Sequence, residues 1–189
     1  PLTVGGGIRC LKDIERVLSA GADKVCINSA IIKNNAFLKN AIRNFGSSTI
    51  SIVVETVCVN SKDYISYLNG RELIDIKPID WAQKIEDQGA GELILTSVNK
   101  EGLREGFDVK LIKQISKSVK IPVLAHGGAG DFKQILNVIK KTNISGVMIA
   151  SLFHYHYINF VETKISKKIG NFEFLKNFKK KKVKKNLIK

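Results

Sequence analysis

Apolar runs and helical patterns alternate along the chain as far as residue 150. Short β-branched or apolar runs predict strands, and apolar residues spaced three or four apart predict helices. Strands are expected over 2–4, 24–28, 49–54, 92–96, 122–125 and 146–150. Helices are expected over 11–18, 37–45, 109–119 and 132–139, and Pro78 opens one more. Six strands, most of them followed by a helix, predict an α/β fold with a parallel sheet.

One segment departs from this alternation. Residues 57–76 contain Tyr64, Tyr67 and an Asn69–Gly70 pair between the third and fourth strands. Asn-Gly between strand-forming residues is a strong turn signal, so the segment predicts a β-hairpin outside the parallel sheet.

The chain repeats one pattern at an offset of 122 residues. LTVGGGI followed by VCINSA matches VLAHGGAG followed by VMIASL, which aligns Gly5 with Gly127 and Ser29 with Ser151. Each copy predicts a strand, a glycine turn, a helix and a second strand. Repetition favours a (β/α)8 barrel of related halves with two strands preceding the six seen. The alternative is an open, doubly wound sheet of six strands.

The repeated glycine turns are candidate phosphate sites. Backbone amides exposed by glycine beside a helix start suit an anion. The first site would join Gly5–Gly7 with Asn28 and Ser29, and the second would join Gly127 and Gly128 with Ala150 and Ser151. A turn without a ligand is the alternative for either site alone. Their recurrence favours a ligand with two phosphates.

Other candidates stand at strand ends. Glu55 follows a buried strand and could act as a general acid or base, or be a solvated charge. Thr96, Asn99 and Glu101 lie in or beside the polar loop 97–108 and can hydrogen-bond a ligand. His126 precedes the second glycine pair, where it could contact phosphate, although a structural role is expected.

Two charged residues mark the opposite ends of the strands. Lys24 and Glu92 stand at strand starts, away from the phosphate turns. They predict either an ion pair on that rim or a separate functional site. His154 and His156 follow the last strand, and their spacing suits a metal poorly, so we interpret them as structural.

Charge divides the 189-residue chain into two predicted regions. The net charge is +14, but residues 164–189 hold eleven lysines and one acid, so most of the charge belongs to the tail. We therefore expect a barrel domain over 1–160 and a lysine-rich tail over 161–189. Three scattered cysteines, no long apolar run and no signal peptide predict a cytoplasmic protein without a metal site or membrane contact.

The motifs together resemble a known family. TVGGGI, GADKVCINSA, GAGELILTSVNKEG, HGGAGDF and ASLFHY are similar to the cyclase subunit of imidazole glycerol phosphate synthase, from residue 1 to about 155. The resemblance implies a TIM barrel, (β/α)8, with internal two-fold repetition. It starts at the third strand of that barrel, so the first two βα units are absent.

The resemblance also implies an activity and a partner. The family's cyclase uses ammonia from a glutaminase subunit to cleave a bis-phosphorylated ribulosyl-aminoimidazole carboxamide nucleotide. The products are imidazole glycerol phosphate, for histidine biosynthesis, and an aminoimidazole carboxamide ribotide. No cofactor is implied.

Site residues are carried over by position. Glu55 occupies the place of one of two catalytic aspartates, and the other lies on the missing first strand. Lys24 and Glu92 match two members of a charged ammonia gate, and Asp23 matches a residue facing the glutaminase. Asn99 and Glu101 stand where the family usually has Asp. The implied phosphate ligands are Gly6, Gly7, Asn28, Ser29, Gly102, Gly127, Gly128, Ala150 and Ser151.

Two further readings stay open. Similar barrels pair with amidotransferases that modify surface sugars. The SVNKEG loop, which contains Asn99 and Glu101, and the unusual segment 155–189 would suit such a paralogue. An inactive fragment or binding module is the third reading, with the lysine tail on nucleic acid or an anionic membrane. Few aromatic residues accompany those lysines, so a solvated terminus is expected instead of a nucleic-acid site.

Overall fold

A computed structural model describes residues 1–68 and 70–152 of the chain. The predicted lysine tail over 161–189, the end of the predicted barrel domain, His154 and His156 lie outside the described residues. Asn69 of the predicted Asn69–Gly70 turn lies outside them as well.

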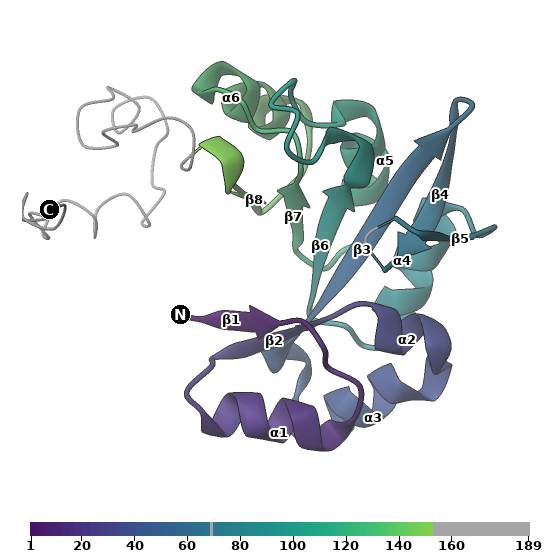
Figure 1. Ribbon diagram of the computed structural model, residues 1–189, viewed down its shortest axis with the longest axis vertical. Coiled ribbons are helices and arrows are strands. Elements are labelled where there is room, and N and C mark those ends of the chain that lie inside the picture. Colours follow the sequence, from purple (N-terminus) through teal and green to yellow (C-terminus); the bar gives the residue numbers. More distant parts are fainter. Residues whose placement is uncertain (69, 153–189) are drawn as a thin grey trace, which may run out of the picture. The chain divides into compact units, whose positions relative to one another are not determined.

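Six parallel strands, as predicted, form most of a sheet that has eight strands in the described part of the chain (Figure 1). Each pairs in parallel with its neighbours in the order β1-β2-β3-β6-β7-β8, with β1 and β8 at the two edges. A doubly wound sheet would reverse this order at a switch point, so that alternative is wrong. The strands instead form a half-barrel of the (β/α)8 type. Their bounds are β1 Thr3–Gly5, β2 Lys24–Ile27, β3 Ile50–Val59, β6 Glu92–Ser97, β7 Val123–His126 and β8 Gly146–Met148.

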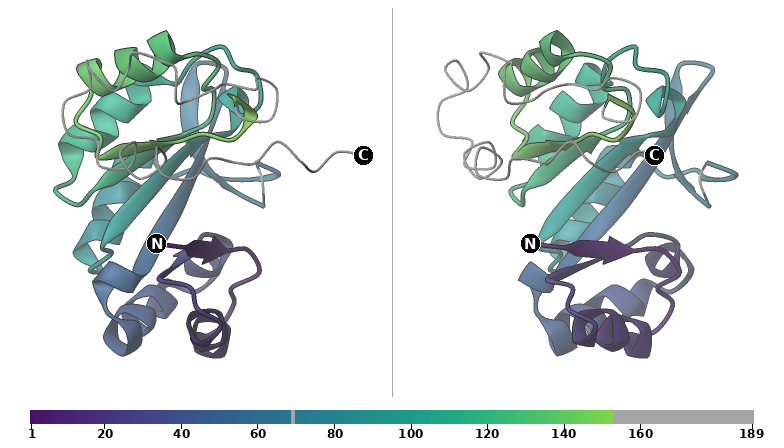
Figure 2. Two further views of the ribbon diagram at one scale, coloured as in Figure 1. Left: turned by 90° about the vertical axis from the view of Figure 1, so that its left-hand side faces the viewer. Right: turned by 60° about the vertical axis from the view of Figure 1, so that its left-hand side comes forward.

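The long helices cover one face of this sheet (Figure 2). Right-handed crossovers between strands in sequential order place every crossover helix on the same side. The helices are α1 Leu11–Ser19, α3 Asn35–Phe45, α4 Pro78–Asp87, α5 Val109–Ser118 and α6 Phe132–Lys141. The short helix α2, Ser29–Lys33, was not predicted, because its five residues are too few to show a helical period. Two 3-10 turns, η1 Ser47–Thr49 and η2 Val98–Lys100, complete the elements.

The two faces of the sheet differ in chemistry, because successive strand residues point to opposite sides. On the helix side, nine strand residues are apolar and at most 2% exposed: Val25, Ile27, Ile50, Ile52, Val54, Leu93, Leu95, Val123 and Ala125. The opposite face, which we call the inner face, carries three rows set by strand register. They are Cys26–Ser51–Glu92, Val53–Ile94–Leu124 and Glu55–Thr96–His126. The polar rows thus lie at the two ends, with an apolar row between them.

The predicted hairpin is present and lengthens the third strand. β3 continues to Val59, where Asn60 and Ser61 turn with positive φ angles of 50° and 62° into β4, Lys62–Tyr67. β5, Glu72–Ile74, then pairs with β4. The expectation that this strand ends before Glu55 is therefore wrong. Antiparallel pairing with β4 supplies backbone partners beyond the parallel ladder, so the strand runs past Glu55.

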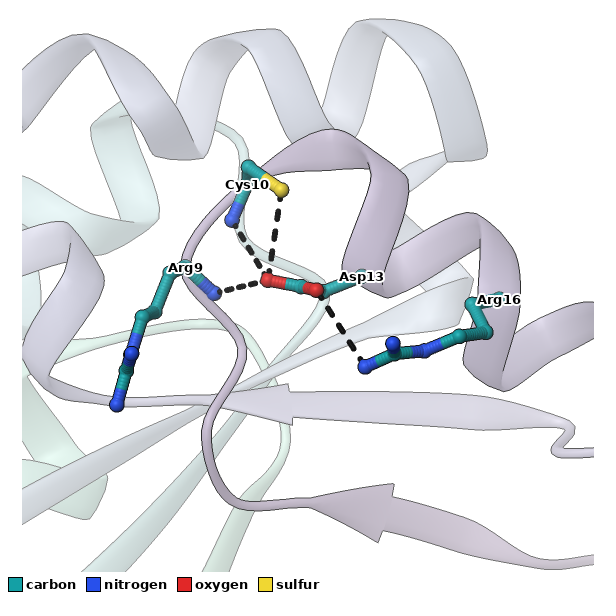
Figure 3. Close-up of polar contacts among 4 residues, drawn as sticks. All are labelled: Arg9, Cys10, Asp13 and Arg16. Atoms are coloured by element: carbon teal, nitrogen blue, oxygen red, sulfur yellow. Dashed lines mark hydrogen bonds and ion pairs between the residues drawn. The ribbon is translucent and has the colours of Figure 1, made fainter.

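A carboxylate fixes the start of α1 and the loop before it (Figure 3). Oδ2 of Asp13 accepts hydrogen bonds from the backbone N–H of Arg9 at 2.9 Å and of Cys10 at 3.2 Å. The Cys10 thiol donates to the same oxygen at 3.4 Å, and Arg16 lies 3.5 Å from Oδ1. The hydrogen bond from Arg9 is the main cause that lowers the pKa of Asp13. This cap anchors the loop that carries the first glycine turn.

Candidate active site at the carboxyl ends of the strands

The residues predicted to bind substrate come together at one end of the sheet. Both glycine turns follow parallel strands, β1 and β7, so both lie at the carboxyl ends. Glu55, Thr96 and His126 lie on the inner face at the same end. The sequence repeat therefore corresponds to two equivalent positions in the half-barrel.

Glu55 lies in a row of hydroxyl-bearing residues. It is 9% exposed and stands opposite Ser66 on β4 and Thr96 on β6. The Thr96 side chain is buried, and its Oγ1 lies 3.2 Å from Nδ1 of His126. Thr56 donates its hydroxyl to the Thr96 carbonyl at 3.1 Å, which holds β3 and β6 together beside this row. The row can bind and move protons at the mouth of the half-barrel.

The first glycine turn is open to solvent. Gly6 and Gly7 have φ angles of +97° and +69°, and a β-carbon at either position would meet nothing within 4 Å. Among the described residues, the amides of Gly7 and Ile8 donate to no protein acceptor. Ser29, the first residue of α2, follows the neighbouring strand β2. This turn can present backbone amides to an anion.

The second glycine turn is buried beneath a loop. Gly127 and Gly128 have φ angles of +93° and +99°, and Gly128 accepts a hydrogen bond from the amide of Gly106 at 2.7 Å. A β-carbon on Gly127 would lie 2.7 Å from the Ser97 carbonyl oxygen, and one on Gly128 would collide with that of Gly106. Packing therefore requires both glycines, whatever they bind. Within the described part, the amides of Gly128 and Ala129 still have no acceptor.

Helix α6 holds the far side of this second turn. Asp131 accepts a hydrogen bond from the amide of Gln134 at 2.7 Å, and Gln134 accepts one from the amide of Gly130 at 2.8 Å. This reciprocal cap is the counterpart of the Asp13 contacts at α1. Ala150 is exposed and Ser151 half-buried, both just after β8.

The loop after β6 places its three candidates differently. The side-chain amide of Asn99 accepts from the Cys58 backbone N–H at 2.6 Å and donates to the Cys58 carbonyl at 3.3 Å. Asn99 thus extends the pairing of β3 and is occupied by the backbone. Glu101 and Gly102 are exposed, and Gly102 has a φ angle of +76°.

A separate cluster lies at the amino ends of the strands. Nζ of Lys24 is 3.1 Å from Oε2 of Glu92, and the Ser51 hydroxyl donates to Oε1 of Glu92 at 2.6 Å. The ion pair was one of two predicted alternatives. Ser51 was missed, although it lies four residues before Glu55 and so shares its face. On the same rim, exposed Asp23 accepts a hydrogen bond from the Leu2 amide at 2.5 Å.

The described part of the chain has neither a metal-binding cluster nor a membrane-spanning helix. Within residues 1–68 and 70–152, no three His, Cys, Asp or Glu residues form a group that could hold a metal ion. No helix in those ranges has the length and apolar character needed to cross a membrane.

Comparison with known proteins places this geometry in a family. The family model described as "Histidine biosynthesis protein" matches residues 1–159. The chain is 42% identical over 172 residues to imidazole glycerol phosphate synthase subunit HisF of Hydrogenobaculum sp. (strain Y04AAS1), covering 90% of the chain and 68% of that protein. It is 43% identical over 157 residues to the subunit of the same name from Lactococcus lactis subsp. cremoris (strain MG1363), covering 82% of the chain and 61% of the relative.

A third relative gives the same result. The HisF subunit of Bacillus cereus (strain G9842) is 42% identical over 156 residues, which are 82% of the chain and 62% of that protein. The chain thus spans about two thirds of the length of these curated relatives or somewhat less. The resemblance in the motifs is confirmed by a family match over most of the chain. The chain belongs to the family of histidine biosynthesis proteins that includes imidazole glycerol phosphate synthase subunit HisF.

Proposed function

We propose that this chain carries the cyclase activity of imidazole glycerol phosphate synthase in histidine biosynthesis. The observation that supports the proposal most is the inner-face carboxylate of Glu55, at the same end of the sheet as both glycine turns. A buried carboxylate between two candidate anion sites fits a substrate with a phosphate at each end. The HisF names of the similar proteins agree with this reading.

In this proposal, the two turns hold the substrate by its phosphates. Gly6, Gly7, Asn28 and Ser29 would bind one phosphate. The second site would use Gly127, Gly128, Ala150 and Ser151, together with Gly102 of the loop that covers them. The amides of Gly7, Ile8, Gly128 and Ala129 have no acceptor among the described residues, which supports such binding. Glu55 would transfer protons at the reacting centre between them.

The opposite rim would receive ammonia from a glutaminase partner in the cytoplasm. Lys24 and Glu92 are paired there, and Asp23 is exposed beside them. The apolar row Val53–Ile94–Leu124 lies between this pair and the row of Glu55 on the inner face. Neutral ammonia, unlike ammonium ion, can cross an apolar layer without a large desolvation penalty. The apolar row between the two polar rows therefore suits the passage of ammonia from the Lys24–Glu92 pair to Glu55.

The experiment measures ammonia-dependent turnover of the bis-phosphorylated substrate with ammonium salt and no glutaminase. We expect Glu55→Gln to lower turnover by about 10²–10⁴-fold, the usual contribution of a general acid or base. Glu55→Asp should raise turnover, because the family positions its carboxylate one methylene closer to the strand. Glu15→Gln, on the exposed side of α1, is the matched control and should have no effect.

An unchanged rate in Glu55→Gln would contradict the proposed role of Glu55. Transfer of ammonia to a sugar, without formation of imidazole glycerol phosphate, would favour the surface-sugar reading over the cyclase.

A further inference from the structure

His126 belongs to the inner-face row Glu55–Thr96–His126. The proposed function assigns no role to its imidazole. It lies half-buried on the inner face and directly precedes Gly127. Its Nδ1 is held at 3.2 Å by the Thr96 hydroxyl on the adjacent strand β6. Among the described residues, Nε2 has no hydrogen-bond partner.

The contact of Nδ1 with Thr96 sets the direction of the other ring nitrogen, Nε2. The two ring nitrogens of an imidazole point to nearly opposite sides, and a bond at one fixes what the other can do. Because Nδ1 faces β6, Nε2 faces away from β6, toward the side on which β8 pairs with β7. The residues that follow these two strands are Gly127–Gly128 and Ala150–Ser151, which would form the proposed second phosphate site.

We propose that His126 is an anion ligand of the second phosphate site, with Nδ1 positioned by Thr96 and Nε2 donating to a phosphate oxygen. This inference rests on the proposed function, which supplies the phosphorylated ligand. The site then combines two backbone amides, of Gly128 and Ala129, with a side chain that can carry a positive charge. The first site has no histidine at the matching position, which is Val4. The two phosphates are therefore bound unequally, because among the described residues only the second site has a side chain whose charge ordinarily changes near neutral pH.

Imidazole is the side chain whose ordinary charge change falls between pH 5 and 8. Among the described residues, the other titratable groups on the surrounding elements are carboxylates, lysine and arginine, which ordinarily change charge outside that window. They are Glu55 on β3, Asp131 at the start of α6, and Lys100, Glu101, Arg104 and Glu105 in the loop after β6. Anion affinity at this site should therefore rise as pH falls from 8 to 6.

Sulfate is the probe, because its own charge is constant over this range, whereas phosphate titrates. The ¹⁵N-labelled full chain is titrated with sulfate at pH 6 and pH 8, following the imidazole nitrogens by NMR. His126→Gln assigns the His126 signals among the three histidines. We expect sulfate to shift Nε2 of His126 and to bind about tenfold tighter at pH 6, the value of one charge-assisted hydrogen bond.

Variants distinguish the role of His126, which binds the anion, from that of Thr96, which positions the imidazole. His126→Gln should remove the pH dependence, and Thr96→Val should weaken binding at pH 6 by releasing Nδ1, with Thr96→Ser restoring it. The matched control is Thr56→Val, which removes a buried threonine hydroxyl that does not touch the imidazole. Thermal unfolding checks that each variant is folded.

The outcomes distinguish this inference from the proposed function. Sulfate binding that keeps its pH dependence in His126→Gln overturns the role of His126 and leaves the cyclase proposal standing. No sulfate binding to the wild-type chain overturns both. A His126-dependent sulfate site in a chain without cyclase turnover supports the inference and overturns the proposed function.

Discussion

At the scale of single residues, the carboxylate of Asp13 anchors the loop behind the first glycine turn. Three groups of Arg9 and Cys10 donate to one oxygen of Asp13, and these bonds lower its pKa. A carboxyl with a lower pKa in the folded state stabilises the fold above its unfolded pKa. That stabilisation is lost as pH falls through the folded pKa.

Asp13→Ala should therefore lower the melting temperature at pH 7 by a few degrees. The difference between wild type and variant should shrink as the pH falls below about 4, the usual pKa of an aspartate. Circular dichroism melting curves at pH 7 and pH 3 measure both effects. Asp87→Ala, exposed at the end of α4, is the control and should show no such pH dependence. An Asp13→Ala difference that persists unchanged at pH 3 would contradict the role of the carboxylate.

Sequence patterns locate some site residues and miss others for a physical reason. Glu55, His126 and the paired glycines are visible because strand ends and repeats are local features. Ser51 also binds Glu92 of the Lys24–Glu92 pair. This contact depends on the register between β3 and β6, which no local sequence pattern shows. The engagement of Asn99 with Cys58 likewise depends on how the loop folds back on β3.

At the scale of elements, the two glycine turns share a sequence and differ in their surroundings. Both need positive φ angles, but only the second is packed under the loop after β6. Gly7→Ala should cost about 1 kcal/mol, from the positive φ alone. Gly128→Ala should cost at least about twice as much, because the backbone must also move away from Gly106.

Urea unfolding followed by fluorescence measures this difference. The chain has one tryptophan, Trp81, which is buried on α4 and reports the transition. Gly46 also has a positive φ angle, and an added β-carbon there would meet nothing within 4 Å. Gly46→Ala is therefore a second control for the cost of the φ angle alone. Equal losses in Gly7→Ala and Gly128→Ala would show that the covering loop does not constrain the second turn.

The parallel strands and the crossover helices were predictable at this scale, because each buries one apolar face with its own period. Two features were not. Helix α2 is a single short turn, and the continuation of β3 past Glu55 depends on a partner strand, β4, that folds back from later sequence.

At the scale of the described unit, the parallel sheet has two edges. β1 and β8 each pair with one strand among the described residues, and a strand edge without a partner there can pair with another chain. The chain of 189 residues should therefore associate in solution. Light scattering after size-exclusion chromatography should give a mass above 20.9 kDa that rises with concentration.

A lysine introduced beside β1 tests whether the sheet edge causes the association. Leu2 precedes β1 and is 56% exposed, so Leu2→Lys should reduce association, as lysines do on natural sheet edges. Leu103→Lys changes an equally exposed leucine, at 55%, away from either edge and should have little effect. A monomer at all concentrations would contradict the prediction.

The sequential order of the parallel strands also bears on how the chain folds. Every parallel strand pairs with the parallel strand before or after it along the chain, so native contacts do not wait for distant sequence. Local contacts lower the contact order and with it the loss of chain entropy before the first contacts form. Strand β2 can complete its pairing with β3 before β7 has been synthesised. Folding can thus proceed during translation, one βα unit after another.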